Sequence, residues 1–195
     1  ELIVSETKNK IEIVDIYSNK FLLNKNYIVK NGDFMKSKND NSYLIFNNVK
    51  ICLAKNSSIK FKKIKNNRIF VEHLKGTLLI NKENNTKLKF QIQILDNLIS
   101  GIQNKIYINQ FERNKFALKS FLGLNFKSFY NKNIKKLKKN TTYKYEMKLQ
   151  ETNINNISQD PLIKNCLINN KNINSNYLKS FSCMTKDKKL ICGYK

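Results

Sequence analysis

The chain has 195 residues, and its 37 basic side chains outnumber 14 acidic ones to give a formal net charge of +23. A hydrophobic content of 41% is enough for a packed core and excludes a purely disordered tail. No apolar run approaches the roughly 18 residues of a membrane-spanning helix, so no membrane insertion is expected. A surface this positive favours a polyanionic partner, and nucleic acid is the commonest one.

The positive charge is carried almost entirely by lysine, since Arg68 and Arg113 are the only arginines. Asparagine is also abundant, whereas the chain has one proline and no tryptophan. This bias is typical of an AT-rich, reduced genome, in which lysine replaces arginine without loss of charge. Such drift does not explain the shortage of acidic residues, so the charge still indicates an anionic partner.

Short apolar runs separated by turn residues predict an antiparallel meander in the first part of the chain. Asn31-Gly32-Asp33 is a strong turn signal, and Asn-rich breaks at 47–48, 56–58 and 66–67 separate the later runs. The predicted strands cover residues 2–4, 11–17, 43–46, 49–54, 59–64, 68–74 and 77–80, with a further strand or hairpin in 21–30.

The apolar spacing then changes to three- and four-residue intervals between residues 86 and 102. This spacing predicts an amphipathic helix, which Gly101 ends. The apolar positions of this helix are Leu88, Ile92, Leu95, Leu98, Ile99 and Ile102.

The second half repeats the order of sheet and helix. Its predicted strands lie around 106–111, 116–118, 124–130 and 143–149. A second helix follows Asn153, and Pro161 is expected to kink or restart it. The chain is therefore predicted to have an α+β fold of two tandem repeats, each a small antiparallel β-sheet with one packed helix. The first repeat spans 1–105, and the second spans 106–195 with a basic C-terminal tail.

The residues of an enzyme active site are missing from this pattern. His73 is the only histidine, and its alternation with apolar neighbours in RIFVEHL predicts a strand residue instead of a catalytic base. The five glycines form no phosphate-binding loop, and no pair of acidic residues lies in an apolar setting. We therefore expect no enzymatic activity, no cofactor and no small-molecule substrate.

The four cysteines are Cys52, Cys166, Cys183 and Cys192. No C-x-x-C pair occurs and His73 is near none of them, so no metal site is expected. A disulfide would require a secretion route, and the opening ELIVSETKNK has neither the basic start nor the long apolar run of a signal peptide. The cysteines are therefore interpreted as reduced, buried thiols.

Two lysine clusters are the candidate phosphate contacts. They consist of Lys135, Lys136, Lys138 and Lys139, and of Lys186, Lys188 and Lys189 near the C-terminus. The first cluster is either a solvated hairpin or a phosphate contact, and the position of the second favours insertion into a groove. No aromatic and basic pattern typical of single-strand stacking occurs, so recognition of backbone and shape is expected.

Several short blocks follow one another in a defined order. They are 96–102 (DNLISGI), 120–123 (SFLG), 146–149 (EMKL), 153–158 (NINNIS), 170–173 (NKNI) and 177–181 (YLKSF). In this order the blocks resemble the universal large-subunit ribosomal protein family called L-six in bacteria and L-nine in eukaryotes.

The resemblance implies two α+β repeats and a structural role in the large ribosomal subunit. Such a protein would bind ribosomal RNA near the sarcin–ricin loop and the factor-binding region, beside neighbouring ribosomal proteins in the cytoplasm. It adds Lys171 and Lys179 to the expected RNA contacts. The chain departs from the family where 30–42 looks inserted and where Asn174 and Ser175 replace basic residues.

Two other functions stay open. The run 31–61 resembles the repeated short strands of a regulator-type domain, which favours a secreted or periplasmic β-rich binding domain. That interpretation predicts a signal peptide upstream of Glu1 and leaves the blocks after residue 96 unexplained. A generic basic RNA-binding module is the third alternative.

Overall fold

The computed structural model describes residues 1–83, 86–129 and 134–152, the single residues Leu162 and Cys166, and the backbone of 182–186 and 189–193. These residues form twenty strands, and only Leu162 and Cys166 among them have a helical backbone. No helix within this part of the chain is long and apolar enough to cross a membrane.

The fold is organised around one strand, β10 (Arg68–Lys82), which is 15 residues long. Its first half pairs antiparallel with β9 (Ser58–Lys65) and parallel with β11 (Lys89–Ile94). Its second half pairs antiparallel with β8 (Val49–Leu53) and β13 (Lys105–Glu112). Each half therefore belongs to a different layer of the molecule.

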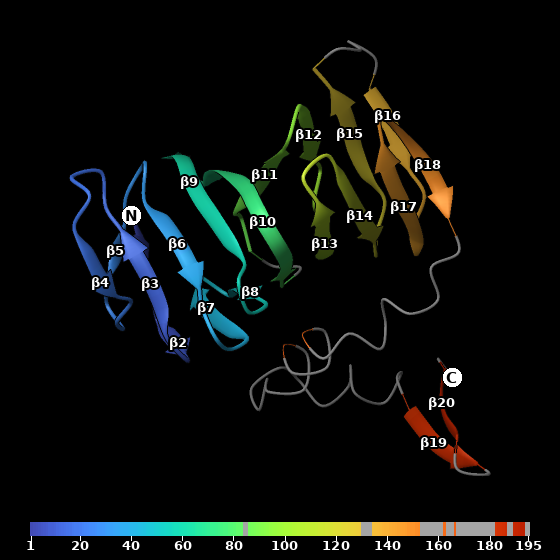
Figure 1. Ribbon diagram of the computed structural model, residues 1–195, viewed down its shortest axis with the longest axis horizontal. Helices are drawn as coiled ribbons and strands as arrows, with labels where there is room; N and C mark the ends of the chain where they lie inside the picture. The colour runs from blue at the N-terminus through green and yellow to red at the C-terminus, as the bar shows by residue number, and fades with distance from the viewer. Residues whose placement is uncertain are drawn as a thin grey trace.

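The first layer extends from β4 at one end to β16 at the other, as Figure 1 shows. Its order is β4 (Lys20–Leu22), β3 (Ile11–Val14), β6 (Phe34–Ser37), β9, β10, β11, β12 (Asn97–Ser100), β15 (Leu124–Ser128) and β16 (Ile134–Leu137).

The second layer extends from β2 to β18. Its order is β2 (Glu6–Lys8), β7 (Ser42–Phe46), β8, β10, β13, β14 (Lys115–Ser120), β17 (Thr141–Glu146) and β18 (Lys148–Thr152). Two small pairs stand apart: β1 (Leu2–Ile3) with β5 (Ile28–Val29), and β19 (Ser182–Lys186) with β20 (Lys189–Gly193).

Aromatic contacts show that the two layers face each other. Phe46 on β7 lies 6.5 Å from Phe61 on β9 and 6.3 Å from Phe90 on β11, measured between ring centroids. Nearer the other end, Phe126 on β15 lies 6.2 Å from Tyr145 on β17. Alternate residues of both layers fill one continuous core, as expected when two sheets pack face to face.

Asparagine pairs make the tight turns of this meander. Asn47 and Asn48 have φ values of 43° and 61°, and Asn66 and Asn67 have 49° and 59°. These turns join β7 to β8 and β9 to β10 through two residues with left-handed backbone, which asparagine tolerates better than most residues. The predicted breaks at 47–48 and 66–67 are confirmed.

The predicted α+β fold class is wrong, because the segment expected as the first helix forms β11 and β12. Leu88, Phe90, Ile92 and Ile94 alternate strictly and are buried, which is the two-residue period of a strand. Leu95 has a φ of 51° in the turn between the two strands. The second predicted helix, after Asn153, lies outside the described residues, and the repeat boundary at 105/106 stays a prediction.

The change of layer along β10 takes place at Gly76, which has a φ of +77°. A Cβ atom at this position would lie 2.3 Å from Ser57 Oγ and 2.9 Å from Ser57 Cα. Ser57 Oγ also accepts a hydrogen bond from the backbone N–H of Thr77, at 2.8 Å. The turn in β10 therefore requires a residue without a side chain.

Gly76→Ala is expected to lower the free energy of unfolding by about 2–5 kcal/mol, from left-handed backbone strain and the clash with Ser57. Gly123→Ala is the matched control, because its Cβ would meet only the Leu137 carbonyl oxygen at 3.3 Å. Urea unfolding of both variants measures the difference. Equal losses would contradict the role of Gly76.

His73 lies in β10 as predicted, between Ile59 of β9 and Ile94 of β11, and is 2% exposed. Burial lowers its pKa to about 4. The imidazole is therefore neutral at pH 7 and serves as a core side chain.

Because the unfolded chain binds this proton at higher pH than the folded one, stability is expected to fall as the pH drops from about 6.5 towards 4. At pH 4.5 this histidine should cost about 2–3 kcal/mol relative to pH 7. His73→Leu should lose that part of the pH dependence while keeping the part due to carboxylates. Urea unfolding of both proteins at the two pH values measures it, and parallel pH profiles would refute it.

Candidate functional site

The structure places the predicted lysines in three groups. Lys171, Lys179 and Lys188 lie outside the described residues. Lys186 and Lys189 pair through their backbone at the closed end of the β19–β20 hairpin, and their side chains are outside the described part. The four lysines between 135 and 139 are all described, and they define the candidate site.

These four lysines occupy the basic corner, which we define as residues 134–141. β16 is the edge strand of the first layer, whereas β17 belongs to the second layer, so residues 138–140 carry the chain from one layer to the other. Asn140 has a φ of 53°, which lets the chain turn sharply at this crossing.

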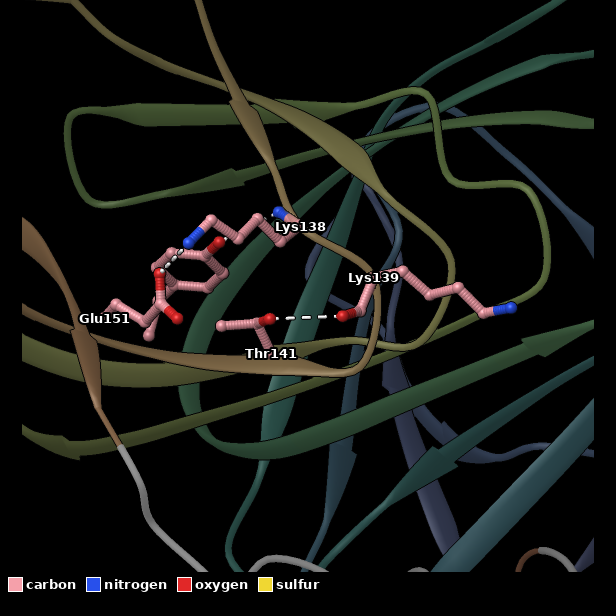
Figure 2. Close-up of polar contacts among 5 residues, drawn as sticks. Lys138, Lys139, Thr141 and Glu151 are labelled. Carbon is pink, nitrogen blue, oxygen red and sulfur yellow. Dashed lines mark hydrogen bonds and ion pairs between the residues drawn. The ribbon is translucent and has the colours of Figure 1, made fainter. Parts of the chain in front are cut away.

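Two hydrogen bonds fix the corner, as Figure 2 shows. The backbone N–H of Lys138 donates to the Tyr143 hydroxyl at 2.8 Å, and the Thr141 hydroxyl donates to the carbonyl oxygen of Lys139 at 3.1 Å. Tyr143 is 2% exposed, so the corner is tied to the packed core. The lysine side chains therefore project from a fixed backbone.

Two of the four lysines already have partners within the protein. Lys138 Nζ forms an ion pair with Glu151 Oε2 at 3.0 Å, and this pair raises the pKa of Lys138 above its ordinary value of 10.5. The pair is therefore present at neutral pH, and the amine loses its charge only as the pH rises through this raised pKa. Lys135 Nζ lies 5.9 Å from the centroid of the Tyr143 ring, within the range of a cation–π contact.

Lys136 and Lys139 are the two lysines of the corner that are free to meet an anion. Both are exposed, and no carboxylate of the described residues lies within salt-bridge distance of either. In Figure 2 the side chain of Lys139 extends away from the ion pair between Lys138 and Glu151. The corner can bind phosphate or carboxylate oxygens as point charges, without the bidentate geometry that arginine would give.

A second feature of the structure was missed by sequence reasoning. Cys52 and Cys166 form a disulfide across a sequence separation of 114, with their Cα atoms 6.3 Å apart. Both residues are buried as predicted, but their interpretation as reduced thiols is wrong. Cys183 and Cys192 occupy opposite positions in the β19–β20 register, and their side chains lie outside the described part.

The disulfide lies in a small apolar cluster on the outer face of the second layer. Cys52, Leu79 and Tyr107 are cross-strand neighbours on β8, β10 and β13, and Leu162 and Cys166 pack on them. The sequence feature that indicates this cluster is the continuous apolar run around Cys52. A strand that is covered on both faces lacks the alternation of apolar and polar residues. All five residues of β8 are buried.

One buried lysine, Lys50, and two half-buried ones, Lys105 and Lys119, lie next to this cluster. Lys50 and Lys105 flank Asn81 in the cross-strand row next to Cys52 and Leu79, and Lys119 is the neighbour of Tyr107. Burial lowers the pKa of all three amines. Lys50 Nζ also lies 4.0 Å from the centroid of the Tyr43 ring. Lys50, which is 4% exposed, is thus largely enclosed by the fold, whereas Lys105 and Lys119 stay partly exposed.

This architecture defines the chain as a two-layer β-sheet domain whose layers share one long strand. No protein-family model matches the sequence, and no curated protein matches it. Two crystal structures from Parabacteroides distasonis ATCC 8503, each provisionally described as that of an anti-sigma factor, are similar in fold.

The structure at 1.65 Å resolution matches with a TM-score of 0.51 and 8% identity, over 62% of this chain and 59% of that one. The structure at 2.50 Å resolution matches with a TM-score of 0.50 and 8% identity, over 82% of this chain and 97% of that one. The chain thus spans 59% of the length of the first of these matches. At this identity the likeness concerns the fold alone.

Replacing both Lys136 and Lys139 by glutamine is expected to weaken the salt dependence of polyanion binding. The slope of log K against log salt concentration should become shallower by about 1.4, because each phosphate contact with a single strand contributes about 0.7. Fluorescence titration with poly(U) at several salt concentrations measures the slope. Lys8→Gln with Lys10→Gln, at exposed sites elsewhere, removes the same net charge. An equal decrease in this control would show that binding depends on net charge and not on the corner.

Proposed function

We propose that this chain is a β-rich binding domain of a regulatory protein and that it acts in an oxidising, extracytoplasmic compartment. The observation that carries the proposal is the Cys52–Cys166 disulfide. Structural disulfides persist in secreted and periplasmic proteins and are rare in the reducing cytoplasm.

The position of the disulfide supports a structural role. Cys52 and Cys166 are 1% and 2% exposed, so small reductants reach neither sulfur in the folded protein. The bond closes a loop of over a hundred residues, for which chain entropy gives about 4–5 kcal/mol of stabilisation. A chain that depends on this bond requires conditions in which the bond forms.

The regulatory part of the proposal draws on the fold. Both structures of similar fold from Parabacteroides distasonis carry a provisional description as an anti-sigma factor. An anti-sigma factor acts against another protein, a sigma factor, and the similar fold supports a protein-binding role for this chain. The secreted or periplasmic alternative from the sequence is thus the one that we favour.

The ribosomal function stays a prediction, but the α+β repeats that its resemblance implied are not the fold observed in the described residues. The generic RNA-binding module is the second candidate. It is favoured by one observation, the two exposed lysines of the basic corner, Lys136 and Lys139, which have no carboxylate partner among the described residues.

Compartment and redox state can be measured together in native cells. Cells are lysed in N-ethylmaleimide, fractionated, and analysed by mass spectrometry for the cross-linked peptides of Cys52 and Cys166. The proposal expects the linked pair in the extracytoplasmic fraction. Alkylated Cys52 in a chain that sediments with the large ribosomal subunit at about 0.5 M salt would overturn it, because that salt removes weakly held electrostatic binders.

The disulfide should also dominate the stability of the purified protein. Reduction is expected to lower the free energy of unfolding by about 2–5 kcal/mol, because the unfolded chain regains its loop entropy. Guanidinium unfolding with and without dithiothreitol measures the change. The double variant Cys52→Ala, Cys166→Ala should have the lower free energy of unfolding both with and without dithiothreitol. If dithiothreitol still lowered the stability of this variant by several kcal/mol, the stabilisation would not come from the Cys52–Cys166 bond.

A further inference from the structure

Six exposed apolar residues lie in β1, β4, β5 and the β3–β4 turn, and the strands β4 and β5 are at the blue end of Figure 1. We call this set the apolar end. It consists of Ile3, Ile16, Tyr17, Phe21, Leu22 and Ile28, with exposures from 36% to 78%. Ile3 and Ile28 are direct cross-strand partners, and the Phe21 ring lies 5.4 Å from that of Tyr27. Phe21 lies on the same face of the sheet as its buried cross-strand partner Ile13, whereas Leu22 lies on the opposite face, so the apolar end covers both faces of β4.

The β3–β4 hairpin presents part of this surface in a fixed conformation. Asp15 Oδ1 accepts hydrogen bonds from the backbone N–H groups of Tyr17 and Asn19, at 2.9 and 2.8 Å. Asp15 Oδ2 accepts another from the Asn19 side chain at 2.9 Å. Tyr17 is nevertheless 78% exposed. An aromatic side chain on an ordered turn binds with little loss of conformational entropy.

The backbone of β4 is an open sheet edge, because among the described residues it pairs with β3 alone. Hydrogen bonds from Asp15 N–H to Asn19 O and from Leu23 N–H to Ile11 O set which residues face β3. In an antiparallel pair the intervening residues face the other way. Lys20 and Leu22 therefore direct their N–H and C=O groups away from the sheet.

Charges select the partner of this edge. Lys20, Lys25 and Lys30 are exposed, and no carboxylate of the described residues lies within salt-bridge distance of them. Three acidic side chains near this edge are already engaged: Glu12 pairs with Lys38, Asp15 holds the turn, and Asp33 is buried. Two copies meeting at β4 would bring two sets of exposed lysines close together, which disfavours self-association and favours an acidic partner.

We propose that the edge of β4 binds an extended acidic segment of another protein by strand addition, with the apolar side chains of that segment on the face of Phe21 and its acidic side chains on the face of Lys20. Backbone hydrogen bonds to Lys20 and Leu22 supply the pairing, and the three lysines select acidic side chains. The proposal rests on the proposed binding function and names the surface and the chemistry of the partner. It does not use the disulfide.

The test uses the full oxidised chain and fluorescein-labelled peptides of the form Glu-Xaa-Glu-Xaa-Glu-Xaa-Glu, in which Xaa is valine, leucine, phenylalanine or tyrosine. Matched peptides carry lysine in place of glutamate or proline at two central positions. Fluorescence anisotropy measures binding. The glutamate peptides should bind at least tenfold more tightly than either matched set, since proline removes the pairing N–H groups.

Leu22→Pro and Leu22→Ala separate backbone pairing from side-chain contact. The Leu22 N–H faces away from β3, so proline at this edge position keeps the β3–β4 pairing. Leu22→Pro should weaken binding at least tenfold and Leu22→Ala by less, while Met147→Ser, at a site that is 94% exposed, should leave binding unchanged. Thermal unfolding confirms that each variant is folded.

Equal binding of the glutamate and lysine peptides, or no binding of either, would overturn the proposal. So would a dimer seen in sedimentation that Leu22→Pro abolishes, because the edge would then serve a second copy. If the peptides do not bind but the Cys52–Cys166 pair is found in the extracytoplasmic fraction, the β4 binding surface is rejected and the proposed compartment is kept. If the peptides bind tightly but the chain is found reduced in the cytoplasm, the compartment is rejected and the binding surface is kept.

Discussion

The whole fold depends on β10, because this interior strand is hydrogen-bonded to neighbouring strands in both layers. Its first half has β9 and β11 as neighbours, and its second half has β8 and β13. A shift of one residue along β10 would turn the core side chains of both layers towards solvent at once. The left-handed backbone at Gly76 fixes the point where one half ends and the other begins.

The functional features lie along the two layers that β10 joins. The basic corner lies at β16, which is one end strand of the first layer, and the apolar end lies around β4, the end strand on the opposite side. The disulfide lies on the outer face of the second layer, next to β10. The net charge of +23 is thus divided among lysines that are enclosed, lysines that are paired and lysines that are free to meet a partner.

Much of the strand pattern could be predicted from local sequence, since turn residues and alternation act over a few positions. The asparagine pairs at 47–48 and 66–67 and the strand position of His73 are examples. The predicted helix over 86–102 failed because spacing at Leu88, Ile92 and Leu95 was counted without Phe90 and Ile94, which complete a strict alternation. The disulfide could not be predicted, because it depends on contact between residues separated by 114 positions. The lysines of the basic corner were found, but which of them is paired depends on Glu151, which only the folded β17–β18 pair brings near.

The distance in sequence between Cys52 and Cys166 also sets an order of events during biosynthesis. A chain made at about 5–20 residues per second exposes the first thiol roughly ten seconds before the second one is synthesised. During that time Cys52 lies on the outer face of β8, without the cover that Leu162 and Cys166 later provide. The correct bond can close only after the second half of the chain has been laid against the first. The presence of the disulfide therefore shows that Cys166 has packed on the outer face of the second layer.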